Sequence, residues 1–181
     1  MQEAPIEAAD MSWDYAASNT RIRDLYEAAK EHAWNAGSDL CWDHPLSRQY
    51  CPVVQGSSPL QGFAPFEALC EQDRIRLLWL RHGLELSDIL HGEQGALLLS
   101  AQLVHSMPTV EAKLFASSQV NDEARHVEFF SRYLNEIVGE ISLPGEALRR
   151  VIRSALDDPR WELKMITCQI LIESLALSRF Q

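Results

Sequence analysis

Apolar residues recur every three to four positions along most of this chain, which is the period of an α-helix. The longest such segment runs from about Pro65 to about His105, and a bend is expected near Gly83. Ser106 and the Pro108 that follows it predict the start of a second long helix, which runs to Gly139. Because no segment has the convincing apolar–polar alternation of a strand, the pattern indicates an all-α fold.

Shorter helices are expected at both ends of this pair. Ser18 and Asn19 are good N-caps for a helix that would end at Gly37. Between residues 38 and 65, prolines and glycines interrupt every regular pattern and predict a long irregular loop. A basic helix over residues 146–156, and a last helix from Asp157-Asp158-Pro159 into the C-terminus, complete one expected domain over residues 1–181.

Composition and charge narrow the class of protein. The chain has 181 residues, 46% of them hydrophobic, and a formal net charge of −10, which is typical of a globular domain and argues against nucleic acid as a partner. No uncharged run approaches the roughly 20 apolar residues of a membrane span, and the N-terminus does not resemble a secretory signal. Without export the four cysteines are expected to be reduced, which favours a cytoplasmic location.

Three glutamates stand on helix faces that are otherwise apolar. Glu123 interrupts the apolar stripe of its helix, and His126 projects beside it one turn later. Glu93 interrupts a similar stripe on the preceding helix, and Glu173 is the one charge in residues 166–177, a segment that should be buried on all sides. The two stripes are Ala112, Ala116, Gln119, Val127, Phe130, Leu134 and Ile137 around Glu123, and Leu86, Ile89, Leu97, Ser100 and Val104 around Glu93.

The spacing of these glutamates favours a metal site. Glu93 and Glu123 are 30 residues apart, which suits two antiparallel helices joined by a short turn, with both carboxylates at the same level. A glutamate on one helix and a Glu-x-x-His on the next form half of the di-iron site of ferritin-like bundles. Each residue alone also has an ordinary interpretation: Glu-x-x-His is common on helix surfaces, Glu93 could be exposed, and Glu173 could pair with Arg149 or Arg153.

Three motifs of this chain resemble those of bacterial ferritin-like di-iron proteins. They are HGEQGAL at residues 91–97, QVNDEARHVEFF at residues 119–130 and IESLAL at residues 172–177. The chain is similar there to the ribonucleotide reductase small subunit, the multicomponent monooxygenases and the p-aminobenzoate N-oxygenases, over about residues 12–181. The resemblance implies a ferritin-like helical bundle in which Glu93 is a terminal ligand of one iron, Glu123 bridges two irons, His126 completes the first and Glu173 serves the second. Carboxylate and imidazole ligands suit iron, with manganese as the alternative metal.

Differences from the family pattern narrow the function. The pattern includes a second Glu-x-x-His after Glu173, in a last metal-bearing helix that would fall beyond Gln181. Phe130 stands where a radical-forming reductase subunit has tyrosine, and Gly95 and Cys168 stand where ligand-binding oxidases form a cross-link. The resemblance therefore implies an O₂-activating oxidase or oxygenase for a small organic substrate, and leaves an electron donor and a homodimer open. The alternative is a non-catalytic helical protein that binds metal, or a partner chain, through an incomplete site.

The other histidines and the tryptophans are expected to have structural roles. His91 is two residues from Glu93 and so should face elsewhere, while His82 and His105 are weaker candidates for the site. His32 and His44 are expected to face solvent. The five tryptophans are interpreted as core or loop anchors rather than electron carriers.

Overall fold

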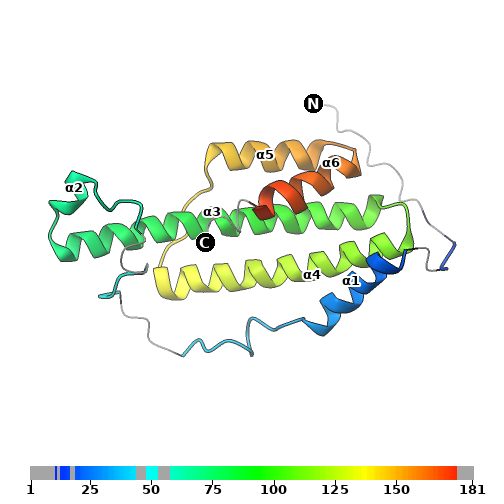
Figure 1. Cartoon of the computed structure of the whole chain (residues 1–181), viewed down its shortest axis with the longest axis horizontal. Coiled ribbons are helices and arrows are strands. Elements are labelled where there is room, and N and C mark those ends of the chain that lie inside the picture. The colour runs from blue at the N-terminus through cyan, green and yellow to red at the C-terminus, as the bar shows by residue number, and fades with distance from the viewer. Residues whose placement is uncertain (1–10, 12, 17–18, 44–47, 53–57, 175–181) are drawn as a thin grey trace.

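The structure is a computed structural model, and it describes residues 11, 13–16, 19–43, 48–52 and 58–174. A long helix, α3 (Glu71–Ser106), runs through the molecule, and α4 (Val110–Tyr133) returns antiparallel beside it (Figure 1). Helix α1 (Thr20–Glu31) lies on α4. Helices α5 (Glu146–Asp157) and α6 (Trp161–Met165) pack on α3. The described residues form no strand, as the sequence pattern predicts.

Helix α1 begins where the sequence predicts and ends earlier than expected. The side chain of Asn19 accepts a hydrogen bond from the backbone N–H of Ile22, so Asn19 is the N-cap. The helix ends at Glu31 rather than near Gly37, because Asn35 begins a turn of its own. Its side-chain oxygen accepts from the backbone N–H of Gly37 at 2.8 Å, and these local bonds replace helical ones.

The expected single helix from Pro65 is divided in two, and the expected bend near Gly83 does not occur. A short helix, α2 (Ala64–Glu67), is separated from α3 by residues 68–70. Helix α3 continues through Gly83, which is buried. A Cβ atom at this position would lie 2.8 Å from Cγ1 of Val138, so glycine here permits close packing rather than a bend.

Two helical segments widen into π-helix, which the sequence pattern does not predict. Helix α4 continues as η1 (Leu134–Val138) and stops at Gly139, whose φ is +84°. Helix α6 begins at Trp161, two residues after the expected proline, and continues as η2 (Ile166–Ile172). The prediction that this last segment is buried on all sides is wrong, because no described element covers its outer face. The exposed apolar side chains of the segment are Ile166, Ile170 and Leu171.

Apolar clusters lie at three levels along α3, and α4 contributes residues to the first and the third of them. Glu93 follows the first cluster on α3 and precedes the second. The three clusters centre on Leu86, Leu90, Phe130, Leu134 and Val138; on Ala96, Leu99, Ala155 and Cys168; and on Leu103, Met107 and Ala116. Within the described part of the chain, no helix has the length and hydropathy of a membrane span.

Candidate metal centre

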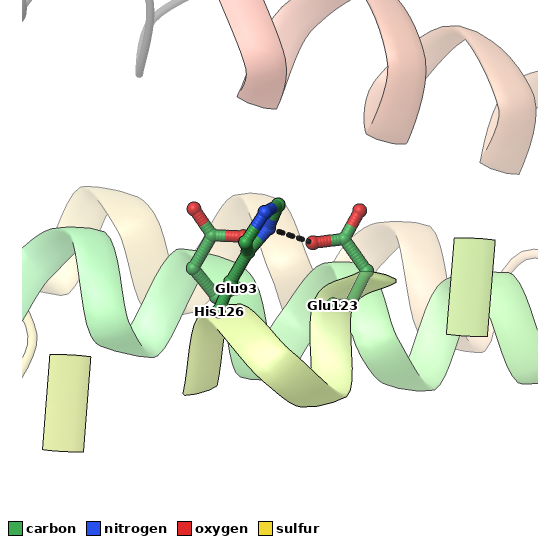
Figure 2. Close-up of side chains that lie close together, drawn as sticks. All are labelled: Glu93, Glu123 and His126. Atoms are coloured by element: carbon green, nitrogen blue, oxygen red, sulfur yellow. Dashed lines mark hydrogen bonds and ion pairs between the residues drawn. The ribbon is translucent and has the colours of Figure 1, made fainter. Parts of the chain in front are cut away.

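Two carboxylates and one imidazole meet between α3 and α4. Nδ1 of His126 lies 3.1 Å from Oε2 of Glu93 and 3.3 Å from Oε2 of Glu123 (Figure 2). One ligand atom from each residue lies within 4.8 Å of the other two. The described residues contain no other such group of three histidine, cysteine, aspartate or glutamate side chains. We call these three residues the triad.

The triad forms because the turn between the two helices is short and well capped. Helix α3 ends at Ser106, and the side chain of Thr109 accepts a hydrogen bond from the backbone N–H of Ala112 at the start of α4. The antiparallel helices then bring Glu93 and Glu123 to one level, as their spacing predicts. Both carboxylates, from helices joined only by residues 107–109, therefore face the same imidazole.

Glycine beside Glu93 serves helix packing rather than ligand access. A Cβ atom at Gly95 would lie 2.7 Å from Cδ1 of Ile152, so α5 packs directly on the backbone of α3 here. A Cβ atom at Gly92 would meet only Cγ2 of Ile172, at an ordinary 3.8 Å. Helix α5 thus supports α3 from the side, at a position two residues after Glu93.

Burial and mutual charge shift the pKa of every triad residue. Glu123 is 3% exposed, and burial raises the pKa of its carboxyl to about 7. Hydrogen bonds with Glu123 and Glu93 raise the pKa of the His126 imidazole to about 10. Burial opposes ionisation of Glu93, but its hydrogen bonds with His126 and Glu123 together hold its pKa below the usual range. The positive charge of the His126 imidazolium thus compensates the buried carboxylates of Glu93 and Glu123. A bound metal cation would compensate the same charges.

Glu173 faces the same pocket as the triad without joining it. A pocket of about 760 Å³ is lined by Glu173 and all three triad residues. Burial and the negative charge of Glu93 raise the pKa of Glu173, which is half-buried. Among the described residues, Glu173 forms no ion pair with Arg149 or Arg153, the alternative partners, and Arg149 lies 3.7 Å from Glu146 instead.

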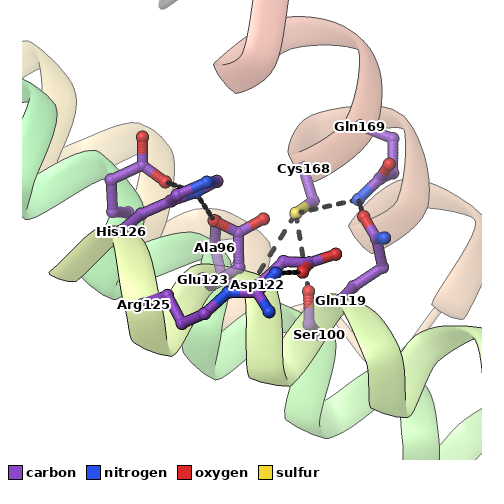
Figure 3. A network of polar contacts seen from close by, with 10 residues as sticks. Ala96, Ser100, Gln119, Asp122, Glu123, Arg125, His126, Cys168 and Gln169 are labelled. Carbon is purple, nitrogen blue, oxygen red and sulfur yellow. Dashed lines mark hydrogen bonds and ion pairs between the residues drawn. The ribbon is translucent and has the colours of Figure 1, made fainter. Parts of the chain in front are cut away.

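A neutral polar network holds η2 beside the triad. Cys168 is fully buried, and its Sγ lies 3.9 Å from Oγ of Ser100 on α3 (Figure 3). Next to it, Nε2 of Gln169 donates to Oε1 of Gln119 on α4 at 3.1 Å. Burial and the charge of Glu123 raise the pKa of the Cys168 thiol to about 11, so it stays protonated at neutral pH. This network fixes the segment that ends at Glu173.

Sequence reasoning missed the aromatic residues that surround His126. The ring of Trp34, in the loop after α1, lies 6.3 Å from the His126 imidazole, centroid to centroid. The guanidinium of Arg125 lies over the Trp34 ring and pairs with Asp122. No spacing rule links a loop tryptophan to a helix, whereas Phe129, three residues after His126, could have been assigned to the same face.

Other expected roles have mixed outcomes. Trp34, Trp42, Trp79 and Trp161 are half-buried, in agreement with the anchor interpretation, whereas Trp13 is 75% exposed. His91 faces away from the triad, and its Nε2 lies 2.9 Å from the carbonyl oxygen of Ser142. His32 is exposed as expected, and His44 lies outside the described residues.

One comparison with known proteins identifies the family of this chain. The family model of the p-aminobenzoate N-oxygenase AurF matches residues 16–163, a range that includes the triad. The chain belongs to this family. The p-aminobenzoate N-oxygenase family is a family of ferritin-like di-iron enzymes. Family membership and the helical structure of the described residues together confirm the predicted all-α ferritin-like bundle. Glu173 lies beyond the matched range. No curated protein and no solved structure matches the chain.

Proposed function

We propose that this protein is a di-iron oxidase or oxygenase that uses O₂ to oxidise a small organic substrate. Glu93 and His126 would hold one iron, Glu123 would bridge two, and Glu173 would serve the second. When bound, the iron supplies the reduction of O₂ and the oxidation of the substrate. Membership of a di-iron oxygenase family supports the reaction class.

The observation that carries this proposal is the convergence of the triad. Two carboxylates from separate helices, one of them 3% exposed, share one imidazole nitrogen with all three ligand atoms within 4.8 Å. Burying like charges together is unfavourable unless something positive compensates them. Carboxylate oxygen with imidazole nitrogen is a donor set that suits iron and manganese, so the residues fit the metal that the family uses.

The pocket beside the triad supports an aromatic substrate. Besides the triad and Glu173, it is lined by the rings of Trp34, Phe129 and Phe130 and by the guanidinium-bearing Arg125. Aromatic walls bind flat rings through offset or edge contacts. The Arg125 guanidinium already pairs with Asp122, so the aromatic rings carry this inference. The family takes its name from the N-oxygenation of p-aminobenzoate, so we propose small aromatic amines as the first substrates to test.

Iron binding and O₂ consumption together test the proposal. Anaerobic titration of the full chain with Fe(II) should show saturable binding, and O₂ should then be consumed faster when p-aminobenzoate or a related arylamine is present. Glu123→Gln and His126→Gln should each lose binding and O₂ consumption. Glu128→Gln is the matched control, since Glu128 is an exposed glutamate on the same helix.

The outcome also separates the enzyme from the non-catalytic alternative. Saturable iron binding that depends on the triad, with no O₂ consumption above that of free Fe(II), would favour a metal-binding protein. If the unmutated chain and Glu123→Gln bind iron equally weakly, the metal site itself is wrong.

A further inference from the structure

Tyr133 and His82 form a hydrogen-bonded pair that the proposed metal centre does not use. Oη of Tyr133, the last residue of α4, lies 3.2 Å from Nε2 of His82 on α3. Their rings meet edge to face with centroids 5.9 Å apart. Burial lowers the pKa of His82 and raises the pKa of Tyr133, so at neutral pH a phenol O–H faces a neutral imidazole. Such a pair is suited to proton transfer.

Two aromatic rings, those of Trp34 and Phe129, link this pair to the triad. The Trp34 ring is 6.3 Å from His126, the Phe129 ring is 6.4 Å from Trp34, and the Tyr133 ring is 6.2 Å from Phe129. His126, Phe129 and Tyr133 also share one face of α4, at relative positions 0, 3 and 7. Seven residues of helix span about 10 Å, so Tyr133 lies about two helical turns from His126.

Next to His82, Trp79 lines a second pocket. The ring of Trp79 lies 5.7 Å from His82, edge to face. Trp79 lines a surface pocket of about 1040 Å³, together with Arg48 and Arg76. An aromatic path therefore runs from the pocket at the triad, through Tyr133 and His82, to a different pocket at the end of α3.

We propose that Tyr133 is a redox-active residue that exchanges single electrons with the metal centre at the triad, with His82 as its proton acceptor. This inference rests on the proposed function, because the oxidised metal centre is the oxidant of Tyr133. Trp34 and Phe129 fill the space that the electron crosses, and Trp79 is the point at which an external one-electron reductant, a thiol or a reduced carrier protein, approaches.

The step balances in electrons and protons. Tyr133 gives one electron to the oxidised metal centre, its O–H bond breaks, and the proton forms an N–H bond at Nε2 of His82. The products are a neutral tyrosyl radical, an imidazolium and a metal centre reduced by one electron. The external reductant then returns one electron to Tyr133, and His82 returns the proton to the phenolate oxygen.

Radical detection in the iron-loaded full chain tests the path. After rapid mixing of the Fe(II)-loaded protein with O₂ and freeze-quenching, we expect a tyrosyl signal in the electron paramagnetic resonance spectrum. Tyr133→Phe should abolish the signal while keeping the ring, and Tyr26→Phe, on α1, should retain it. His82→Gln should slow radical formation by about a hundredfold, the lower end of what a positioned proton acceptor contributes. A role in packing alone would leave the signal unchanged in all three variants.

A metal-free experiment separates this inference from the proposed function. The chain has four tyrosines, so substituting Tyr15, Tyr26 and Tyr50 by Phe leaves Tyr133 as the sole tyrosine. Flash oxidation of this variant by a ruthenium tris-bipyridine complex should give a tyrosyl absorbance whose formation slows in His82→Gln. If iron does not bind and this absorbance still appears, the proposed function fails and the redox pair stands. Iron oxidation by O₂ without a radical on Tyr133 overturns the inference, whatever the flash experiment gives.

Discussion

Nδ1 of His126 on α4 lies 3.1 Å from Oε2 of Glu93 on α3, although the two residues are 33 positions apart in the sequence. The same nitrogen lies 3.3 Å from Glu123, so one proton on the imidazole serves two carboxylates. The proposed metal ion would bind through these same atoms. Protons and metal ions therefore compete for the triad, and this competition links metal affinity, pH and stability.

Metal binding should release protons. At pH 7 His126, with a pKa of about 10, is protonated, and Glu123, with a pKa of about 7, is about half protonated. Both must lose their protons to act as ligands, so we expect more than one proton released per ion and up to about a tenfold gain in affinity per proton for each pH unit. Calorimetric titration with Mn(II), which is stable in air, in buffers of different ionisation enthalpy measures this number. An affinity that does not change between pH 6 and pH 8 would contradict the arrangement of the triad.

Without metal, the protein should lose stability as the pH rises above 7. The folded pKa of His126 is raised above its ordinary 6.5, so its contribution to stability is complete below pH 6.5 and is lost as the pH rises through about 10. The raised pKa of Glu123 acts in the same direction between pH 4.5 and 7. Because the His126 side chain is 39% exposed, solvent screening reduces the expected loss to about 1–2 kcal/mol.

Denaturant unfolding of the metal-free protein at pH 7 and pH 9.5 measures this loss. His126→Gln removes the titrating group and should flatten the dependence, while His32→Gln, at an exposed position, should leave it unchanged. Stability that rises over this interval in the unmutated chain would show that His126 is not held as an imidazolium.

The chain should bind one metal ion more tightly than a second. Glu93, Glu123 and His126 present three ligand atoms within 4.8 Å, whereas Glu173 lines the pocket outside that group. Elemental analysis after iron loading should therefore give nearer one iron than two per 181-residue chain. Glu173→Gln should leave that ion in place, and Glu93→Gln should remove it. Two tightly held irons would mean that further ligands, from this chain or from a partner, complete the site.

Substituting alanine for two glycines on α3 should change the free energy of unfolding in opposite directions. At Gly95 the added Cβ would lie 2.7 Å from Cδ1 of Ile152, so the Ile152 side chain or α5 must shift, and Gly95→Ala should lower the free energy of unfolding by about 1–2 kcal/mol. At Gly92 the nearest atom is 3.8 Å away, so Gly92→Ala should raise it by about 0.5–1 kcal/mol through helix propensity alone.

Chemical denaturation of both variants measures the contrast. Combining Gly95→Ala with Ile152→Ala should relieve the clash, so the double variant should be more stable than the sum of the two single effects predicts. Equal effects of alanine at the two glycines would contradict the close packing of α5 on α3.

The sequence by itself determined the long helices and the pairing of Glu93 with Glu123. Both follow from local rules: the helical period places each glutamate on an apolar stripe, and 30 residues of fixed rise bring the two stripes to one level across a short turn. The Glu-x-x-His spacing likewise puts His126 beside Glu123, because residues three apart share a helix face.

Only the tertiary structure decided which residues surround the triad. Trp34 reaches His126 from a loop whose path depends on local turn bonds at Asn35, and no periodicity encodes that path. Tyr133 meets His82 across 51 residues, through the packing of α4 on α3. The close approach of α5 at Gly95 and the π-helical turn before Glu173 likewise depend on contacts between distant segments. Local sequence determines which side chains share one face of a helix. Which distant residues pack against that face depends on the burial free energy of the whole fold.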